Sequence, residues 1–319
     1  MWKVSPGPPN PILQIVEEQG ALILDGGLAT ALEARGCDLV DELWSAKILL
    51  EDPELIRAVH LDYLRAGADC ITTASYQATL DGFRKRGLSK AEGGDLLRLS
   101  VRLALEAREA FWREESNRPG RVEPLVAASV GPYGAFLADG SEYTGHYGLS
   151  DADLLEFHRE RWEVLAGEGP DLMACETIPS QQEAEVLLRL LEEIPGPWAW
   201  ISFSCRDGKH LSDGGLLRDA VAACSSGTWV AAVGINCTAP EHVASLVEEA
   251  RKGTDKPILV YPNSGEAYDP ASKRWHATPS PSPWDAGPKA WVREGACGVG
   301  GCCRVGPGGI ARIRRALLG

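Results

Sequence analysis

The chain has 319 residues, 44% hydrophobic and 24% charged, a composition typical of a globular protein with a sizeable core. Its formal net charge is -13, and no dense run of Lys and Arg indicates a nucleic-acid-binding surface. No segment is apolar over the length of a membrane span, and prolines interrupt the first 20 residues, where a signal peptide would need an apolar run. We therefore expect a cytoplasmic protein with neither nucleic acid nor membrane as a partner.

Nine cysteines occur in a chain too large to need disulfide bonds for stability. We expect most of them to be reduced thiols, because free cysteines behave as small apolar residues in cores. Six lie inside predicted strands or helices or lack a partner motif, and we interpret them as structural. These six are Cys37, Cys70, Cys175, Cys205, Cys224 and Cys297.

Eight short apolar runs recur along the chain, and each ends in Gly, Asn, Pro or a polar residue. They cover residues 21–27, 69–76, 124–132, 171–179, 198–205, 229–237, 257–265 and 296–303. Each run is nearly continuous rather than alternating, which is typical of strands buried on both faces of a parallel sheet. Amphipathic segments separate them, so the order strand, turn, helix repeats eight times. This count predicts a (β/α)8 TIM barrel, formed as one domain by residues 1–319.

Sequence signals for helix starts support the prediction that the segments between the runs are helices. Asp52 precedes Pro53, a combination that favours a helix beginning at the proline. Ser180 with Glu183, and Thr238 with Glu241, have the spacing of capping boxes directly after a predicted strand.

Two connections are unusually long, at residues 131–150 and 263–287. Both follow the C-terminal end of a predicted strand, which is the side on which barrel enzymes build their active sites. Both combine aromatic side chains with Gly and Ser. We interpret them as candidate lids over the barrel mouth.

Residues able to carry chemistry gather at predicted strand ends, and these ends would meet at one mouth of the barrel. They are Asp25 after the first strand, Tyr76 after the second, Glu176 in the fourth, Cys237 after the sixth, and Cys302 with Cys303 after the eighth.

Cys237, Cys302 and Cys303 would bring three sulfur atoms to this mouth. Three thiolates with one open position form a known type of zinc site. Two adjacent cysteines can share one metal only where the backbone turns sharply, which Gly300 and Gly301 would permit. The sequence therefore predicts one zinc ion, held by these three cysteines.

A zinc ion with three thiolates has a net charge of about -1, so it activates a bound thiol better than a bound water. We therefore expect a thiol substrate whose sulfur attacks an electrophilic carbon. Asp25 and Glu176 suit the ammonium group of an amino acid. The turn at Gly26 and Gly27 would let the amino acid's carboxylate reach backbone N–H groups.

Two other classes of protein remain possible on the basis of these residues alone. A vicinal cysteine pair such as Cys302–Cys303 can cycle through a disulfide in a non-catalytic zinc or redox barrel. The glycine-rich stretch 298–303 can also bind a phosphate group, although the Lys and Ser/Thr of the usual motif are missing.

The ordered motifs "DGGLAT", "TTASYQAT", "CETIP", "GINCT", "PILVYPNSGE" and "GGCC" together resemble the homocysteine S-methyltransferase family over about residues 21 to 310. The branch that the chain resembles most uses S-methylmethionine, and in some cases S-adenosylmethionine, as the methyl donor for L-homocysteine and forms methionine. Betaine-dependent enzymes are more distant relatives.

The resemblance implies a homocysteine-binding (β/α)8 barrel in which zinc is held by Cys237, Cys302 and Cys303. It implies that Asp25 and Glu176 lie near the amino group of homocysteine, with the backbone of Gly26 and Gly27 close by. Tyr76 matches a tyrosine near the metal and the donor, and Trp44 would line the donor site. Because the betaine-type extension used for oligomerisation does not follow "GGCC", a monomer is expected.

Overall fold

Eight parallel strands form the central sheet of the computed structural model, which describes residues 9–39, 47–194, 196–269, 274–276, 284 and 287–319. Their order around the sheet is β1-β10-β7-β6-β5-β4-β3-β2. The strands are β1 (Leu22–Ile23), β2 (Cys70–Thr72), β3 (Leu125–Val130), β4 (Leu172–Ile178), β5 (Trp198–Phe203), β6 (Val230–Asn236), β7 (Ile258–Tyr261) and β10 (Gly298–Val299). Each lies within one of the eight predicted runs, and the predicted (β/α)8 barrel is confirmed.

The barrel closes between β1 and β2, where the ladder is short. Leu24 forms a parallel bridge to Cys70, and the Asp25 N–H donates to the Cys70 carbonyl at 3.0 Å. The Asp69 N–H donates to the Ile23 carbonyl at 2.7 Å. On its other side β1 pairs with β10 through two residues on each strand. The first and last strands of the barrel are therefore neighbours.

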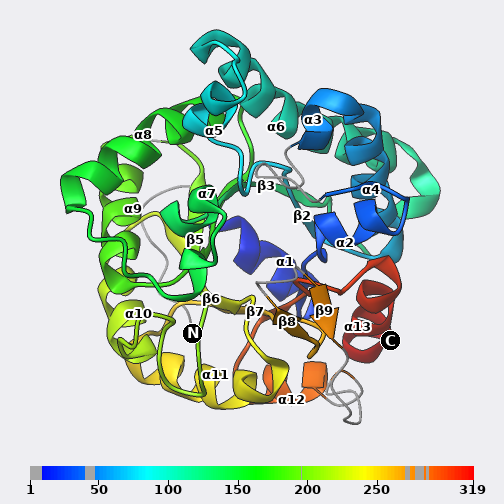
Figure 1. The fold of residues 1–319 in the computed structure, drawn as a ribbon. Helices are drawn as coiled ribbons and strands as arrows, with labels where there is room; N and C mark the ends of the chain where they lie inside the picture. The colour runs from blue at the N-terminus through cyan, green and yellow to red at the C-terminus, as the bar shows by residue number, and fades with distance from the viewer. Residues whose placement is uncertain (1–8, 40–46, 195, 270–273, 277–283, 285–286) are drawn as a thin grey trace.

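Helices surround the barrel as a ring, while α1 lies in the middle of this ring (Figure 1). The α-helices are α1 (Pro11–Gln19), α2 (Leu28–Glu33), α3 (Ile48–Glu51), α4 (Pro53–Ala66), α5 (Leu80–Lys85), α6 (Lys90–Arg113), α7 (Tyr133–Leu137), α8 (Asp151–Gly167), α9 (Gln181–Glu193), α10 (Leu217–Ser225), α11 (Val243–Gly253), α12 (Gly287–Glu294) and α13 (Pro307–Leu318). Among the described residues, 3-10 turns accompany them at η2 (Glu115–Asn117), η3 (Ser141–Tyr143) and η4 (Pro240–His242).

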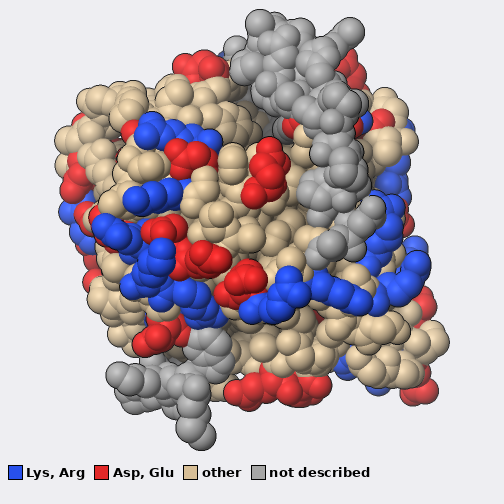
Figure 2. All heavy atoms as spheres, turned by 90° about the horizontal axis from the view of Figure 1, so that it is seen from below, with Lys and Arg blue, Asp and Glu red and all other residues tan. Residues whose placement is uncertain are grey.

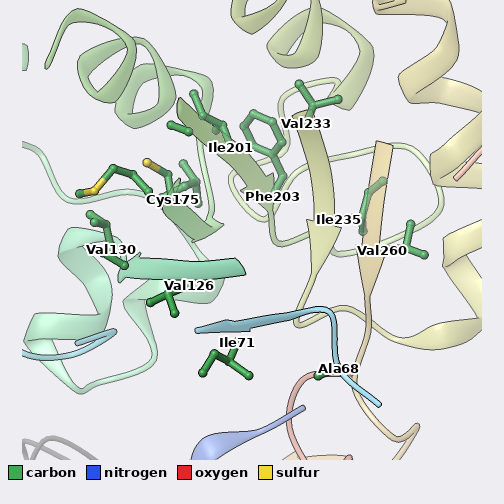
Figure 3. Packing of buried hydrophobic residues seen from close by; sticks show 14 of the residues in the cluster. Ala68, Ile71, Val126, Val130, Cys175, Ile201, Phe203, Val233, Ile235 and Val260 are labelled. Carbon is green, nitrogen blue, oxygen red and sulfur yellow. The ribbon is translucent and has the colours of Figure 1, made fainter. Parts of the chain in front are cut away.

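The core has two layers because successive strand residues point to opposite faces. Residues such as Ile71, Val126 and Ile201 pack between the sheet and the helices (Figure 3). The intervening residues fill the barrel interior, where Ile12 and Ile15 of α1 join them. The helix α1 therefore contributes to the same apolar cluster as the inner side chains of the strands.

The predicted helix starts are confirmed in two of three cases. The helix α4 begins at Pro53 with Asp52 as its N-cap, although the Asp52 side chain makes no capping bond. The Ser180 hydroxyl caps α9 by accepting from the Glu183 N–H, but the capping box is only half formed, because the Glu183 carboxylate binds the Tyr133 N–H instead of the Ser180 N–H. The capping box at Thr238 is wrong: this hydroxyl accepts from the Cys205 N–H and donates to the Asn236 carbonyl, so it fastens strand ends instead.

The two long connections contain short regular elements. The 131–150 loop carries α7 and η3, and α7 lies inside the ring of helices (Figure 1). The described part of the 263–287 connection contains an antiparallel pair, β8 (Ala267–Asp269) with β9 (Arg274–His276). The sequence patterns do not predict this hairpin.

Acidic and basic side chains are interspersed on the side of the molecule that carries α11 and α12 (Figure 2). Ion pairs on these helices include Lys252 with Glu249 and Arg293 with Glu294. Exposed pairs of this kind contribute little to stability. Across the described part of the chain, no helix has the length and apolar character needed to cross a membrane.

Candidate active site at the carboxyl ends of the strands

Three sulfur atoms converge at the mouth of the barrel. The Cys237 and Cys303 sulfurs lie 3.9 Å apart, and those of Cys302 and Cys303 lie 4.0 Å apart. All three are within 4.8 Å of one another. The chain thus brings together residues that are 65 and 66 positions apart in the sequence, as the strand-end argument predicts.

The backbone around Cys237 holds its sulfur in place. Cys237 directly follows β6 and has a φ of 47°, in the left-handed region that non-glycine residues rarely adopt. Beneath it the buried Asn236 amide accepts from the Thr177 N–H at 2.8 Å and donates to the Thr177 hydroxyl at 2.8 Å. The Tyr143 hydroxyl lies 3.1 Å from the Cys237 sulfur. Hydrogen bonds from the Cys302 and Cys303 thiols lower the pKa of Cys237, so this sulfur carries negative charge most readily.

Glycines allow the last strand to bring Cys302 and Cys303 into the same space. A Cβ atom on Gly300 would lie 2.5 Å from the Leu24 Cβ, and one on Gly301 would lie 2.2 Å from the Val305 side chain. Neither position tolerates a side chain without displacing its neighbours. The predicted link between these two glycines and the thiols therefore has a steric basis.

The N–H groups of this segment already have partners. Gly300 donates to the Val260 carbonyl at 2.9 Å, Gly301 to the Asp25 carbonyl at 3.0 Å, and Cys302 to the Pro262 carbonyl at 2.8 Å. None of these three donors is left to bind a phosphate oxygen. The phosphate hypothesis for the glycine-rich stretch therefore lacks structural support.

The spacing of the sulfurs fits a metal ion better than a disulfide. A disulfide requires about 2.05 Å between sulfurs, whereas Cys302 and Cys303 are both free thiols. Four sulfurs arranged tetrahedrally at about 2.3 Å from one metal ion would be separated by about 3.8 Å. The observed 3.9 and 4.0 Å are close to this value, so the three cysteines can hold a metal ion with little movement.

Asp25 lies beside the thiols, two residues after the end of β1, and it is buried. Its carboxylate accepts from the Thr72 N–H at 2.7 Å and from the Thr72 hydroxyl. Burial raises the pKa of Asp25 to about 8, with a smaller contribution from the charge of Glu176, while the Thr72 bonds oppose the rise. The carboxyl group is therefore poised to ionise when a cation binds beside it.

Glu176 occupies the carboxyl end of β4, and its side chain accepts hydrogen bonds from the hydroxyls of Ser129 and Tyr261. Burial raises the pKa of Glu176 to about 7 despite these bonds. Tyr261 in turn accepts from the Trp200 indole N–H at 3.0 Å. The buried Asp25 and the partly buried Glu176 thus face one cavity from separate strands.

The turn after Asp25 approaches the cysteine segment closely. A Cβ on Gly26 would lie 2.2 Å from the Val305 carbonyl oxygen, and one on Gly27 would lie 2.8 Å from the Cys302 carbonyl oxygen. The Gly27 N–H donates to the Val305 carbonyl at 2.9 Å. In this structure that donor is thus not free for a ligand carboxylate.

A cavity of about 280 Å³ joins these groups. It is lined by eight of the nine residues predicted for the site: Asp25, Gly26, Gly27, Tyr76, Glu176, Cys237, Cys302 and Cys303. The ninth, Trp44, lies outside the described residues.

Several residues of the site were not predicted from the sequence. Thr72, Ser129 and Tyr261 line the cavity and bind the two carboxyl groups. Glu142 and Tyr143 enter from the 131–150 loop. The only available signal for these two was the length and aromatic content of that loop, which does not indicate which side chains face inward.

The comparisons with known proteins agree with this geometry. The family model described as homocysteine S-methyltransferase matches residues 22–317. The chain is 52% identical to homocysteine S-methyltransferase YbgG of Bacillus subtilis, over 95% of this chain and 96% of that protein. It is 50% identical to homocysteine S-methyltransferase of Escherichia coli, over 96% and 98%.

A solved structure is similar over almost the whole chain. The metallated form of the homocysteine methyltransferase MmuM from Escherichia coli superimposes with a TM-score of 0.86 at 48% identity, covering 96% of this chain and 99% of that one. Sequence, fold and the three converging thiols lead to the same assignment. The chain therefore belongs to the homocysteine S-methyltransferase family of enzymes.

Proposed function

We propose that this enzyme transfers a methyl group from a sulfonium donor to the sulfur of L-homocysteine, with one zinc ion held by Cys237, Cys302 and Cys303. The observation that carries the proposal is the meeting of three thiols and two carboxyl groups in one cavity. A metal and a thiol substrate account for the sulfurs, and an ammonium group accounts for the carboxyls.

The donor set suits zinc, because thiolates are preferred zinc ligands. Bound there, zinc would lower the pKa of a thiol substrate and keep it as a thiolate at neutral pH. The Tyr143 hydroxyl lies within hydrogen-bond distance of the Cys237 sulfur and would help to orient this metal ligand.

Asp25 and Glu176 bind the ammonium group of homocysteine in this proposal. Burial raises the pKa of both carboxyl groups, and a bound ammonium would favour their ionised forms. The Gly26 backbone lines the same end of the cavity and suits the carboxylate of the amino acid. These contacts would fix the direction of the thiolate sulfur.

The methyl transfer itself needs positioning rather than acid–base catalysis. A lone pair of the homocysteine thiolate forms the new S–C bond, and the donor's S–C bond breaks with its electron pair remaining on the donor sulfur. The thiolate and the sulfonium both become neutral thioethers, and the acceptor becomes methionine. Holding the two sulfurs in line can lower the barrier by several kcal/mol. Tyr76, and by resemblance Trp44, would contribute cation–π attraction to the sulfonium.

The test is a methyl-transfer assay with homocysteine and a panel of donors, including S-methylmethionine, S-adenosylmethionine and betaine, with zinc quantified in the same preparations. We expect transfer from S-methylmethionine, with a lower rate from S-adenosylmethionine and none from betaine. Cys303→Ala should lose zinc and activity together. Cys297→Ala is the matched control, because this nearby buried thiol lies outside the cavity.

Full activity of Cys303→Ala without zinc would refute the metal role. A separate variant, Glu176→Gln, should raise the KM for homocysteine and leave zinc content unchanged. Loss of zinc from this variant would mean that the assignment of Glu176 to substrate is wrong. We also propose that the enzyme acts as a monomer; size-exclusion chromatography with light scattering tests this.

A further inference from the structure

The charge of the cavity is unbalanced. Among the described residues that line it are five acidic side chains and no Lys, Arg or His. The acidic residues are Asp25, Glu33, Asp139, Glu142 and Glu176. Two of them, Asp25 and Glu176, are assigned to the ammonium of homocysteine in the proposed function. The proposed function does not account for the other three carboxyl groups.

Two of the remaining three already have partners. Asp139 accepts from the Ser141 N–H at 2.9 Å and from the Ser141 hydroxyl, so it binds the first residue of the η3 turn. Glu33 lies 3.9 Å from the Arg304 guanidinium. Glu142 differs from both, because its Oε2 atom is buried and has no hydrogen-bond partner in the described structure.

Burial raises the pKa of Glu142 to about 7, with the charge of Cys237 adding to the effect. Burial raises the pKa of the Tyr76 hydroxyl, and the charges of Glu142 and Cys237 add to the rise, which places these three side chains within electrostatic reach of one another. Tyr143, the next residue in the chain, has its hydroxyl 3.1 Å from the Cys237 sulfur. A desolvated carboxyl group with two tyrosine rings beside the thiols suits a cation.

The position of Glu142 is built into the fold. Two buried side chains on α8 and α9 hold the 131–150 loop in place: Arg161 donates to the Gly131 carbonyl at 2.7 Å, and Glu183 accepts from the Tyr133 N–H at 2.6 Å. The η3 turn then packs so closely on α7 that a Cβ on Gly134 would lie 2.3 Å from the Glu142 nitrogen.

We propose that Glu142 binds the cationic group of the methyl donor and so determines the preference of the enzyme for cationic donors. This inference rests on the proposed function. It assigns the second substrate to the part of the cavity that the 131–150 loop lines, whereas Asp25 and Glu176 bind homocysteine.

The sign of the kinetic effect follows from the charges. The positive charge of the donor sulfur disappears as the methyl group leaves, so a carboxylate beside it stabilises the bound donor more than the transition state. Removing that charge should weaken donor binding and leave kcat unchanged or somewhat higher. A residue with only a structural role would lower kcat or affect both substrates.

The experiment compares Glu142→Gln with the wild-type enzyme, and Glu33→Gln serves as the matched loss of a cavity carboxylate. The donors are S-methylmethionine and dimethylsulfonioacetate, a sulfonium without an ammonium group. We expect Glu142→Gln to raise the KM for S-methylmethionine by on the order of 10- to 100-fold, with unchanged zinc content and unchanged KM for homocysteine. Calorimetric titration of S-methylmethionine should show the same loss of affinity. Glu33→Gln should match the wild type.

An equal effect with dimethylsulfonioacetate would identify the sulfonium as the bound cation, whereas an effect confined to S-methylmethionine would identify its ammonium group; both support the proposal. An unchanged donor KM, or an equal rise in the homocysteine KM, would overturn it. If the wild-type enzyme transferred no methyl group from any sulfonium, the proposed function itself would fail, irrespective of Glu142.

Discussion

Replacing Asp25 by asparagine should stabilise the folded protein while weakening its binding of homocysteine. Burial raises the pKa of Asp25 from 3.8 to about 8, so the folded state retains a proton that the unfolded chain releases. Between these two values the free energy of unfolding falls as the pH rises, because the folded state binds more protons than the unfolded state. Asparagine has no such proton to lose.

The expected gain follows from the difference between the ambient pH and the ordinary pKa of aspartate. At about 1.4 kcal/mol per pH unit, asparagine should raise the free energy of unfolding by about 2 kcal/mol at pH 5 and about 4 kcal/mol at pH 7. The amide can keep the local bonds, since the Thr72 N–H still finds an oxygen and the Thr72 hydroxyl can accept from the amide nitrogen.

Urea unfolding of the metal-free protein at pH 5 and pH 7 measures this gain for wild type and Asp25→Asn. The gap between the two proteins should widen by about 3 kcal/mol between these pH values. In parallel, homocysteine should protect the wild type and not the variant against unfolding. An equal stability difference at both pH values, or a variant less stable than wild type at pH 7, would refute the conclusion that burial destabilises the ionised Asp25 carboxylate.

Three further predictions concern the frame of the site. Gly300→Ala should destabilise the fold by about 3 kcal/mol and lower the zinc content. Gly308→Ala, with open space around its Cβ position, should do neither. Equal melting temperatures of these two variants would contradict this prediction. Tyr143→Phe should weaken zinc binding by on the order of 10-fold in a chelator competition, through loss of the contact to Cys237, and an unchanged affinity would argue against that contact. Glu183→Gln should speed amide hydrogen exchange in the 131–150 loop, and the same change at an exposed glutamate of α9 should not.

The barrel was predictable because its strands are buried on both faces. Continuous apolar runs such as 171–179 can pack in few ways other than in a parallel sheet covered by helices. The runs predict longer strands than the structure has where the first and last strands of the barrel meet. There β1 and β10 have two residues each, because the Asp25–Gly27 turn and the Gly300–Cys303 segment form the site instead of extending the strands. The hairpin of β8 and β9 gave no comparable pattern.

The site was predictable where a side chain follows a strand directly. Cys237 and Glu176 lie at strand ends, so their convergence follows from topology alone. Glu142 and Tyr143 were not predictable, because their inward orientation depends on the buried anchors Arg161 and Glu183 on two other helices. No sequence pattern links Arg161 and Glu183 to the 131–150 loop.

The pairing of β10 with β1 has a consequence for the order in which the protein forms. During synthesis from the N-terminus, one edge of β1 stays open until β10 has been made, and Cys237 stays without Cys302 and Cys303 for the same period. Completion of the sheet and assembly of the three-thiol set are therefore one event. A metal ion bound there would connect β6 to β10 across β7, so it would add a link between an early strand of the sheet and the last one to be made.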